Sequence, residues 1–563
     1  MEYVLAVIGG ILLIAGGFHL YDRSAGLRKL RERLERQYGL RPSQKGGVDF
    51  DSVEAYWEER RRAEPPAHWI DSLTWSDLDM DEVFERIDAC QTSIGEEYLY
   101  SVLHEPLFDR EALDRRESLI AFFQDHPEER LDVQTFLARM GKSNYSGLAN
   151  FLYHPEVREI RGGELFSILP FLPLFCLLFM VVNPAAGLIG AMLSIPVNMA
   201  VYYLFKRKVE HELAAVRYIS AMLCCCRRLI RWKSPALPEL REQLKEDFVY
   251  FQSFRGLGQM GRVGASEVDF LADYMNMLLF ADLRGYRRLL SAVKKHRAAF
   301  HRLYRFIGEL DLAICTASFR ESLPVFCAPE FTEENALTFR SLAHPLLRDP
   351  VTNSGILHSA VVTGSNASGK STFVKALAVN GILAQTLHTC SAAAFSTRPA
   401  LVITSMAVRD SLSAGDSYFV TEIKSLRRIL RQAAGETYCV CYVDEILKGT
   451  NTIERIAASA SVLSCLRRMD CLCVTASHDV ELTDLMEGLY ENWHFCETIT
   501  PGGVEFDYKL KAGPSRTRNA IQLLGRMDFP AEITGGAEWM VERFASTGLW
   551  ELPPETGTEK DGE

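Results

Sequence analysis

The segment from Ser359 to Leu387 constrains the fold more than any other part of the chain. Ser359 to Thr363 has the apolar composition of a strand, and a helix is predicted from Phe373 to Leu387. Between them lies a loop that fits the pattern GxxxxGK[ST], with the residues Gly364, Ser365, Asn366, Ala367, Ser368, Gly369, Lys370, Ser371 and Thr372. A strand, a glycine-rich loop and a helix in this order predict a parallel α/β domain that binds phosphate groups.

Each part of this loop suits the phosphate chain of ATP. The glycines allow backbone N–H groups to surround phosphate oxygens, and the helix N-terminus adds a partial positive charge. Lys370 can reach the β- and γ-phosphates, and the Ser371 hydroxyl can coordinate Mg²⁺. We therefore predict that the nine loop residues bind ATP and Mg²⁺. A chance match is the alternative, and the flanking strand and helix argue against it.

Two further predicted strands end in residues with acid–base or metal-binding chemistry. Tyr438 to Val443 is followed by Asp444 and Glu445, and Cys471 to Thr475 leads to His478. We expect Asp444 to lie on the Mg²⁺ side and Glu445 to polarise the attacking water as a general base. His478 is predicted beside the γ-phosphate, because ligands bind at the carboxyl edge of such sheets. A structural ion pair and a structural histidine are the alternatives.

Several segments in this region have the order and spacing of one known family. They are Ala343-His344-Pro345 with Asn353, the loop with Asn366, Asp416 to Ile423, Asp444 to Thr452, Ala476 to Thr483, and Tyr508 to Gly513. Together they resemble the ATPase domain of the MutS DNA mismatch repair proteins, a branch of the ABC-type ATPases, over about residues 339–533. In that family the segment corresponding to 416–423 reaches the nucleotide of the partner subunit. The resemblance therefore implies a homodimer in which Ser417 contacts ATP in trans.

The resemblance extends upstream and also has limits. Gln91 to Leu107 is similar to the start of the MutS core helical domain, so residues of about 70–345 are expected to form core and lever helices. The fifty or so residues between the apolar run that ends at Tyr21 and this core are too few for the mismatch-reading and connector domains, and they contain no Phe-x-Glu mismatch wedge. Leu447 replaces a family glycine. ATP chemistry carries over from the family, and mismatch recognition does not.

Three apolar segments predict membrane spans. Tyr3 to Tyr21 contains no charged residue, and its nineteen residues would be about 28 Å long as a helix. Phe166 to Val182 and Ala185 to Phe205 form a second uncharged region, which Asn183-Pro184 divides into two. A buried hairpin in a soluble core is the alternative for this second region. Its length of about forty residues favours a two-helix transmembrane hairpin.

The flanking charges predict the orientation of these spans. Basic residues follow Tyr21, and Lys206, Arg207 and Lys208 follow the hairpin. By the positive-inside rule, both flanks lie in the cytoplasm. We expect a multi-pass protein, of the cell membrane, with its ATPase domain in the cytoplasm.

Composition and charge complete the domain assignment. A net charge of −11 excludes a protein that coats nucleic acid with positive charge, although residues 206–302 carry 19 Lys and Arg against 10 Asp and Glu. That local excess fits either a nucleic-acid surface or the positive-inside rule.

The predicted domains are a transmembrane helix (1–21), a juxtamembrane helix and linker (22–56), a helical core (57–165), the transmembrane hairpin (166–205), helical lever and core (206–330), the α/β P-loop ATPase domain (331–545) and a disordered tail (546–563).

Two functions fit these features. The first is a membrane-anchored, MutS-like ATPase that hydrolyses ATP as a dimer and engages DNA or a repair partner. The second is a membrane ATPase that couples its ATP state to a membrane partner and has no role on DNA. The basic region 206–302 favours the first, and the missing mismatch domain favours the second.

Overall fold

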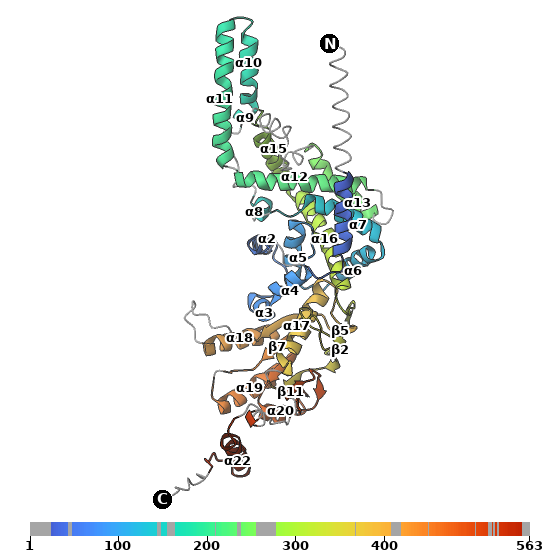
Figure 1. The fold of residues 1–563 in the computed structure, drawn as a ribbon, viewed down its shortest axis with the longest axis vertical. Helices are drawn as coiled ribbons and strands as arrows, with labels where there is room; N and C mark the ends of the chain where they lie inside the picture. The colour runs from blue at the N-terminus through green and yellow to red at the C-terminus, as the bar shows by residue number, and fades with distance from the viewer. Residues whose placement is uncertain are drawn as a thin grey trace, which may run out of the picture. The chain divides into compact units, whose positions relative to one another are not determined.

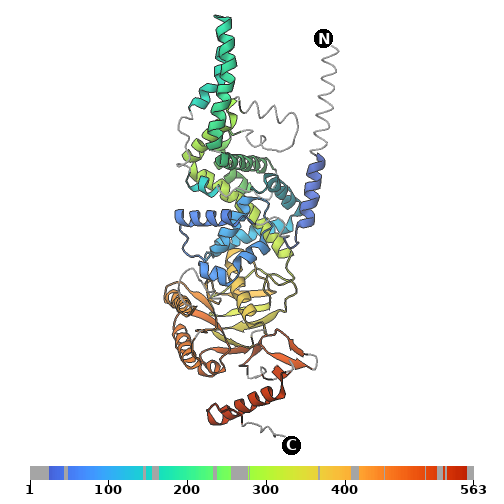
Figure 2. The same ribbon diagram turned by 60° about the vertical axis from the view of Figure 1, so that its left-hand side comes forward.

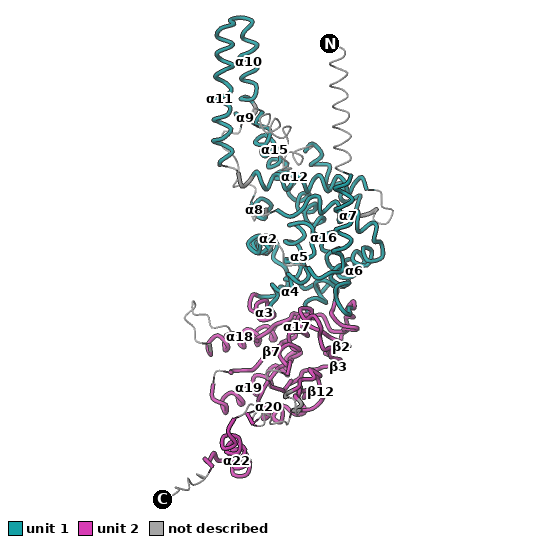
Figure 3. The backbone as a smooth tube through the Cα atoms, viewed as in Figure 1, with its two compact units in different colours: residues 1–71, 79–326, 382–389 teal, residues 72–78, 327–381, 390–563 magenta. Residues whose placement is uncertain are grey.

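The computed structural model describes most of the chain. The described residues are 24–42, 48–143, 148–154, 164–208, 210–232, 238–254, 277, 279–365, 368–406, 418–448, 450–500, 503–515, 521, 524–525 and 529–553. The predicted span Tyr3–Tyr21 lies outside them. The chain divides into two compact units, residues 1–71, 79–326 and 382–389 in unit 1, and residues 72–78, 327–381 and 390–563 in unit 2 (Figure 3).

Unit 1 is helical in its described part. Besides a helix at 24–37, its helices are α2 (Phe50–Ala63), α4 (Met80–Ile87), α5 (Ser93–His104), α6 (Arg110–Asp125), α7 (Pro127–Met140), α8 (Leu148–Tyr153), α9 (Leu165–Ile168), α10 (Leu172–Phe179), α11 (Pro184–Lys208), α12 (Glu210–Arg231), α13 (Pro238–Phe248), α15 (Ala281–Lys295) and α16 (Arg297–Glu321), with short 3₁₀ turns η2 (Leu169–Phe171) and η3 (Val249–Phe251). The all-helical character expected for this part of the chain is confirmed.

Helix α5 lies at the centre of this unit and is buried along its whole length. It begins at the cap residue Thr92, whose hydroxyl accepts a hydrogen bond from Gly95 N at 2.9 Å, and it ends before Glu105-Pro106. The fully buried Asp311 of α16 accepts hydrogen bonds from the backbone of Gln91 and Thr92. This carboxylate therefore joins α16 to the start of α5.

Residues 281–321 of the predicted lever and core region do not form one continuous helix. The described part of this region forms two helices, α15 and α16, which are separated at His296. The backbone of His296 is not helical, with φ −124° and ψ 43°, and its ring stacks on Tyr250 at a centroid distance of 4.1 Å. This break has no proline or glycine to indicate it in the sequence.

Helices α10 and α11 form the predicted apolar hairpin and extend beyond the other helices of unit 1 (Figures 1 and 2). The first half is not one continuous span. Pro170 and Pro173 divide it into α9, η2 and α10, and Pro173 has no N–H to donate to the carbonyl of Leu169. The Asn198 side chain of α11 donates to that carbonyl instead, at 2.9 Å. A Cβ at Gly187 would lie 2.5 Å from Met180 N, so glycine permits the close approach of the two arms.

Unit 2 is built on a six-stranded sheet of order β12-β9-β4-β8-β7-β6. Its strands are β4 (Ala360–Thr363), β6 (Leu401–Ser405), β7 (Cys439–Asp444), β8 (Cys471–Ser477), β9 (Glu491–His494) and β12 (Lys511–Ala512), and all neighbouring pairs are parallel except β12 with β9. A second sheet has the order β1-β5-β2-β3, with β1 (Glu330–Phe331), β2 (Leu337–Leu342), β3 (Asn353–Leu357) and β5 (Ala394–Thr397). The α/β class predicted for this region is confirmed.

The other elements of unit 2 are helices and a short hairpin. They are α3 (Ser72–Asp77), α17 (Lys370–Thr386, whose last residues belong to unit 1), α18 (Tyr418–Ala433), α19 (Thr452–Leu466), α20 (Val480–Leu485), α22 (Ala531–Thr547), β10 (Glu497–Thr500) and β11 (Gly503–Phe506). Residues 546–553 were expected in a disordered tail. Here Thr547 ends α22, and Trp550 stacks on Phe544 with ring centroids 4.3 Å apart.

The buried Glu97 of α5 gives a test of the packing in unit 1. It is 1% exposed and accepts hydrogen bonds from Ser52 Oγ at 2.8 Å and from the Tyr304 hydroxyl. Burial raises the pKa of this carboxyl to about 8, although the Ser52 hydrogen bond lowers it. The stability contributed by its proton is full below the ordinary pKa of about 4.5 and is lost as the pH rises through about 8.

We therefore expect the melting temperature of the purified protein to fall between about pH 5 and 9, and Glu97→Gln to flatten that fall. The amide keeps an acceptor for one of the two hydroxyls and can donate to the other, and it does not titrate over this range. Thermal melts of both proteins across the pH range check this. An equal pH dependence in the two proteins would show that Glu97 is not the group responsible.

Candidate ATP site

Three predicted site segments leave adjacent strands at the same edge of the six-stranded sheet. Thr363 at the end of β4 is paired with Ser477 of β8, and Asp444 at the end of β7 is paired with Ala476 of β8. Because these strands are parallel, the glycine-rich loop, Glu445 and His478 all follow their carboxyl ends. This register brings the starts of the three segments to one edge of the sheet.

The loop after β4 has the conformation that its glycines allow. Gly364 has φ +149°, and a Cβ there would lie 2.8 Å from both Phe495 O and Ser368 Oγ. Ser368 Oγ donates to Ser365 O at 2.7 Å, and Ser365 Oγ donates to Glu497 Oε2 at 3.0 Å. Asn366 and Ala367 lie outside the described residues. The two hydrogen bonds hold Ser365 and Ser368, the described residues that flank them, shortly before α17 begins at Lys370.

Lys370 is the first residue of α17 and one of the most buried cations of the chain. It is 1% exposed, and burial lowers the pKa of its ammonium while the charges of Asp444 and Glu445 raise it. Ser371 and Thr372 follow it in the first turn of α17. A buried ammonium requires a nearby anion, and the γ-phosphate of ATP would supply one.

Glu445 and His478 lie within reach of Lys370. His478 Nε2 is 2.9 Å from Lys370 Nζ and 3.0 Å from Glu445 Oε1, and Lys370 Nζ is 4.0 Å from Glu445 Oε1. Nε2 can accept from the ammonium when it lacks a proton, or donate to the carboxylate when it carries one. The hydrogen bond from His478 and that from Lys448 hold the pKa of Glu445 at about 2, so this carboxylate is ionised at neutral pH.

Asp444 fits the role of a ligand for Mg²⁺. Its Oδ1 atom is buried and has no hydrogen-bond partner among the described residues. A buried carboxylate oxygen without a donor is costly, whereas carboxylate and hydroxyl oxygens are the ligands that Mg²⁺ prefers. Asp444 and Ser371 are therefore the residues that would hold the ion, which would neutralise charge on the phosphate oxygens.

Two contacts that the sequence did not indicate position these groups. Arg455 of α19 pairs with Asp479, with Nη2 2.5 Å from Oδ1 and Nε 2.9 Å from Oδ2, and this pair holds the residue that follows His478. The buried Glu422 of α18 accepts a hydrogen bond from Lys448 N at 3.0 Å, which joins α18 to the segment after Glu445. Neither partner is close in sequence, so no local pattern could have paired them.

The segment after β7 is strained at two residues. Glu445 has φ +59° and Leu447 has φ +55°, and both are non-glycine residues in the left-handed region. Leu447 is the residue that departs from the family glycine, and it adopts the backbone conformation that glycine would adopt most easily. Leucine at this position therefore carries a backbone strain that glycine would avoid.

Other predicted residues contribute less to the described geometry. Ser417 lies outside the described residues, so its predicted contact in trans stays a prediction. Tyr508 was not predicted as a site residue, yet a Cβ on Gly369 would lie 3.0 Å from its ring. Asn353 holds this segment, because its side chain donates to Tyr508 O at 3.0 Å and accepts from Leu510 N at 2.8 Å.

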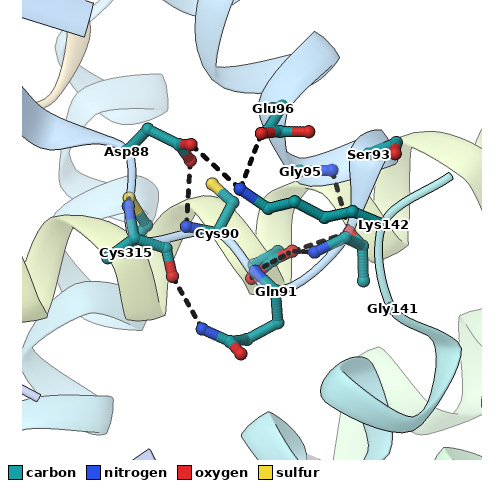
Figure 4. Close-up of polar contacts among 12 residues, drawn as sticks. Asp88, Cys90, Gln91, Ser93, Gly95, Glu96, Gly141, Lys142 and Cys315 are labelled. Atoms are coloured by element: carbon teal, nitrogen blue, oxygen red, sulfur yellow. Dashed lines mark hydrogen bonds and ion pairs between the residues drawn. The ribbon is translucent and has the colours of Figure 1, made fainter. Parts of the chain in front are cut away.

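A second polar cluster lies in unit 1 and resembles a metal site (Figure 4). Ligand atoms of Asp88, Cys90 and Cys315 lie within 4.8 Å of one another. Lys142 Nζ is 3.0 Å from Asp88 Oδ2 and 2.6 Å from Glu96 Oε1, so an ammonium already compensates these carboxylates. Burial raises the pKa of the Cys90 thiol well above its ordinary value, which disfavours the thiolate. We interpret the cluster as a structural ion pair.

Comparisons with known proteins agree with the geometry of unit 2. A family model of MutS domain V matches residues 360–545. The DNA mismatch repair protein MutS of Lactobacillus delbrueckii subsp. bulgaricus is 26% identical over 306 residues, which cover 50% of this chain and 35% of the relative. That of Natronomonas pharaonis is 26% identical over 298 residues, covering 50% and 34%, and that of Thermus thermophilus is 25% identical over 267 residues, covering 46% and 32%.

The matched part of the chain spans about a third of the length of these relatives. It includes the loop after β4, the segment after β7 and the segment after β8, which carry Lys370, Glu445 and His478. MutS proteins typically dimerise and use ATP with Mg²⁺. Residues 360–545 are therefore a MutS domain V, an ATP-hydrolysing domain, and the chain is distantly similar over about half its length to MutS proteins.

Proposed function

We propose that this protein is a membrane-anchored, MutS-like ATPase that hydrolyses ATP as a homodimer and couples the ATP state to DNA binding. The single observation that carries its ATPase chemistry is the cluster of Lys370, Glu445 and His478 at the carboxyl ends of three adjacent strands. The membrane, the dimer and the DNA are argued separately below.

Within the ATP site, we assign different roles to the three groups. Lys370 binds the phosphate chain of ATP, because it is a buried ammonium at the end of the loop that follows β4. Glu445 orients and polarises the attacking water. Its pKa of about 2 makes it a weak base, so orientation contributes more than complete proton removal in the arrangement described. His478 contacts both groups and is placed to respond to the charge at the γ-phosphate.

The exposure of the α10–α11 hairpin supports membrane insertion. Among the described helices, Pro184–Arg207 is long and apolar enough to cross a membrane, and Leu169–Phe179 is apolar but shorter. The apolar side chains of both arms face outward: Phe175 is 62% exposed, Met192 68% and Leu193 61%. This distribution is opposite to that of a buried core hairpin, and it is the arrangement that lipid would favour.

The homodimer is supported by the position of Ser417 and by the exposed start of α18. Ser417 directly precedes α18, and Phe419, Val420 and Ile423 near its N-terminus are each at least 36% exposed. An exposed apolar turn at the start of a helix suits a contact with a second copy. The same segment reaches the partner's nucleotide in the family that it resembles.

Coupling to DNA is proposed from the similarity to DNA mismatch repair proteins. The basic region 206–302 supports it little, because its described charges are partly neutralised: Arg302 pairs with Asp247 at 2.5 Å and Arg287 with Glu164 at 3.6 Å. The alternative is a membrane ATPase that acts on a membrane partner without DNA. The exposed hairpin does not distinguish the two, because it would serve equally well as a membrane anchor or as a contact for a membrane partner.

Substitutions in the ATP site should separate binding from turnover. Lys370→Ala should weaken ATP binding, because the phosphate-binding ammonium is lost. Glu445→Gln should retain binding and slow turnover by roughly 10²–10⁴-fold, the usual contribution of such a group. Nucleotide binding and steady-state hydrolysis measured on both variants check these roles. A Glu445→Gln enzyme with wild-type turnover would remove Glu445 from the mechanism.

Membrane insertion of the hairpin can be tested by photolabelling from the lipid phase. Peptides of α10 and α11 should be labelled in the wild-type protein, with the sites mapped by mass spectrometry. Leu193→Arg should reduce this labelling, since an arginine at the centre of a span costs roughly 2.5–3.5 kcal/mol. The matched control is Ile356→Arg on β3, a residue that is 55% exposed. Equal labelling of the Leu193→Arg and wild-type hairpins would contradict insertion.

The dimer prediction uses subunit mixing. A Lys370→Ala subunit mixed with a Ser417→Ala subunit forms dimers with one doubly damaged site and one intact site, so hydrolysis should partly return. Lys370→Ala mixed with Glu445→Gln is the control, because each subunit then carries its own damaged site and activity should stay low. If the first mixture recovers no more activity than the control, Ser417 acts within its own subunit or only caps α18.

A further inference from the structure

The sequence of α18 places four cations on one face. Lys424, Arg427, Arg428 and Arg431 follow the spacing i, i+3, i+4 and i+7, which brings them to the same side of a helix. With Gln432 they line a hollow of about 490 Å³. We call these four residues the α18 basic face. No described residue that lines the hollow is acidic or apolar.

Two of the four cations, Lys424 and Arg428, interact with other groups of the protein. Arg428 donates to Thr74 Oγ1 at 3.3 Å and to the carbonyl of Thr404, which fixes the base of the hollow. By contrast, Arg427 and Arg431 are exposed, and no carboxylate of the described residues lies within 4.0 Å of either. Arg427 and Arg431 lie four residues apart, where like charges destabilise a helix, and an anion bound beside them would relieve this repulsion.

We infer that the α18 basic face binds the phosphate backbone of duplex DNA. This inference rests on the proposed function and names the surface through which DNA would be held. From Lys424 to Arg431 the helix rises about 10.5 Å, and one DNA strand has a phosphate about every 3.4 Å along the helix axis. A row of cations over this length matches several successive phosphates, whereas a single phosphate would need donors that converge on one point.

The composition of the hollow favours DNA over the other anionic partners. An acidic protein surface normally docks through apolar anchors with charges at the rim, and the hollow has no apolar residue among the described ones that line it. An anionic membrane is flat, and a flat surface would contact the rim of the hollow more than its lining. The exposed apolar side chains of α18, including Phe419 and Ile423, lie in its first turns and are not part of the lining.

This site also has a route to the ATP chemistry within unit 2. Glu422 lies two residues before Lys424 on α18, and it accepts the hydrogen bond from Lys448 N in the segment that follows Glu445. A displacement of α18 would therefore be transmitted through this hydrogen bond to the segment that carries Glu445. DNA bound on the basic face would be expected to change the rate of ATP hydrolysis.

The test is DNA binding by the full-length protein in detergent, measured by fluorescence anisotropy with a labelled duplex of about 30 base pairs between about 50 and 200 mM salt. The double variant Arg427→Ala/Arg431→Ala should bind up to about a hundredfold more weakly, and the slope of log K against log salt should fall by about 2, which is about one unit for each phosphate contact. Arg427→Lys/Arg431→Lys should retain most of that slope. The control Arg340→Ala/Arg468→Ala removes two exposed arginines of unit 2 outside the hollow and should leave the slope unchanged.

The outcomes separate this inference from the proposed function. If the wild-type protein binds DNA and the alanine variant has the same slope of log K against log salt, the basic face is not the DNA site. The proposed DNA role would then still stand. No binding by the wild-type protein overturns both. Loss of dimer in the alanine variant, with its salt slope unchanged, assigns the face to a second copy and overturns the inference. ATP turnover without DNA, equal in all four proteins, shows that the variants are folded.

Discussion

The buried charge of Lys370 is the constraint on which the ATP site depends. An ammonium that is 1% exposed is stable only where anions or acceptors surround it, and the neighbouring strand ends supply Glu445 and His478. His478 Nε2 lies close to both Lys370 and Glu445, but it can form a hydrogen bond with only one of them at a time. The site is therefore a set of competing contacts, and a bound phosphate would change which of them are made.

The surroundings of this cluster are held from several elements of unit 2. Arg455 and Asp479 fix the segment after His478, and Glu422 fixes the segment after Glu445. The left-handed backbone of Leu447 has a cost of roughly 1–2 kcal/mol for a non-glycine residue, so these contacts keep a strained segment in place. Strain of this kind persists where the surrounding structure determines the conformation, as in sites that must respond to a ligand.

The sequence predicted the elements that carry strong local patterns. The glycine loop, the strands before Asp444 and His478, and the apolar hairpin all have such patterns, and the structure has elements at these places. It did not predict the break at His296, where no proline or glycine stands, nor the division of the first hairpin arm at Pro170 and Pro173. The pairing of Arg455 with Asp479, and the ring of Tyr508 beside Gly369, depend on contacts distant in sequence. No periodicity or motif reports such contacts before the chain is folded.

The central claim is that Lys370, Asp444, Glu445 and His478 form one site for hydrolysis of ATP with Mg²⁺. The most direct measurement is ATP turnover as a function of Mg²⁺ concentration for the wild-type protein, Asp444→Asn and the control Asp470→Asn. In the wild-type protein the Asp470 carboxylate pairs with Arg398 at 3.1 Å. The account predicts that Asp444→Asn needs more Mg²⁺ and turns over more slowly, because a neutral amide is a weaker ligand than a carboxylate. The control should match the wild type. Turnover and Mg²⁺ dependence unchanged by Asp444→Asn would contradict the account.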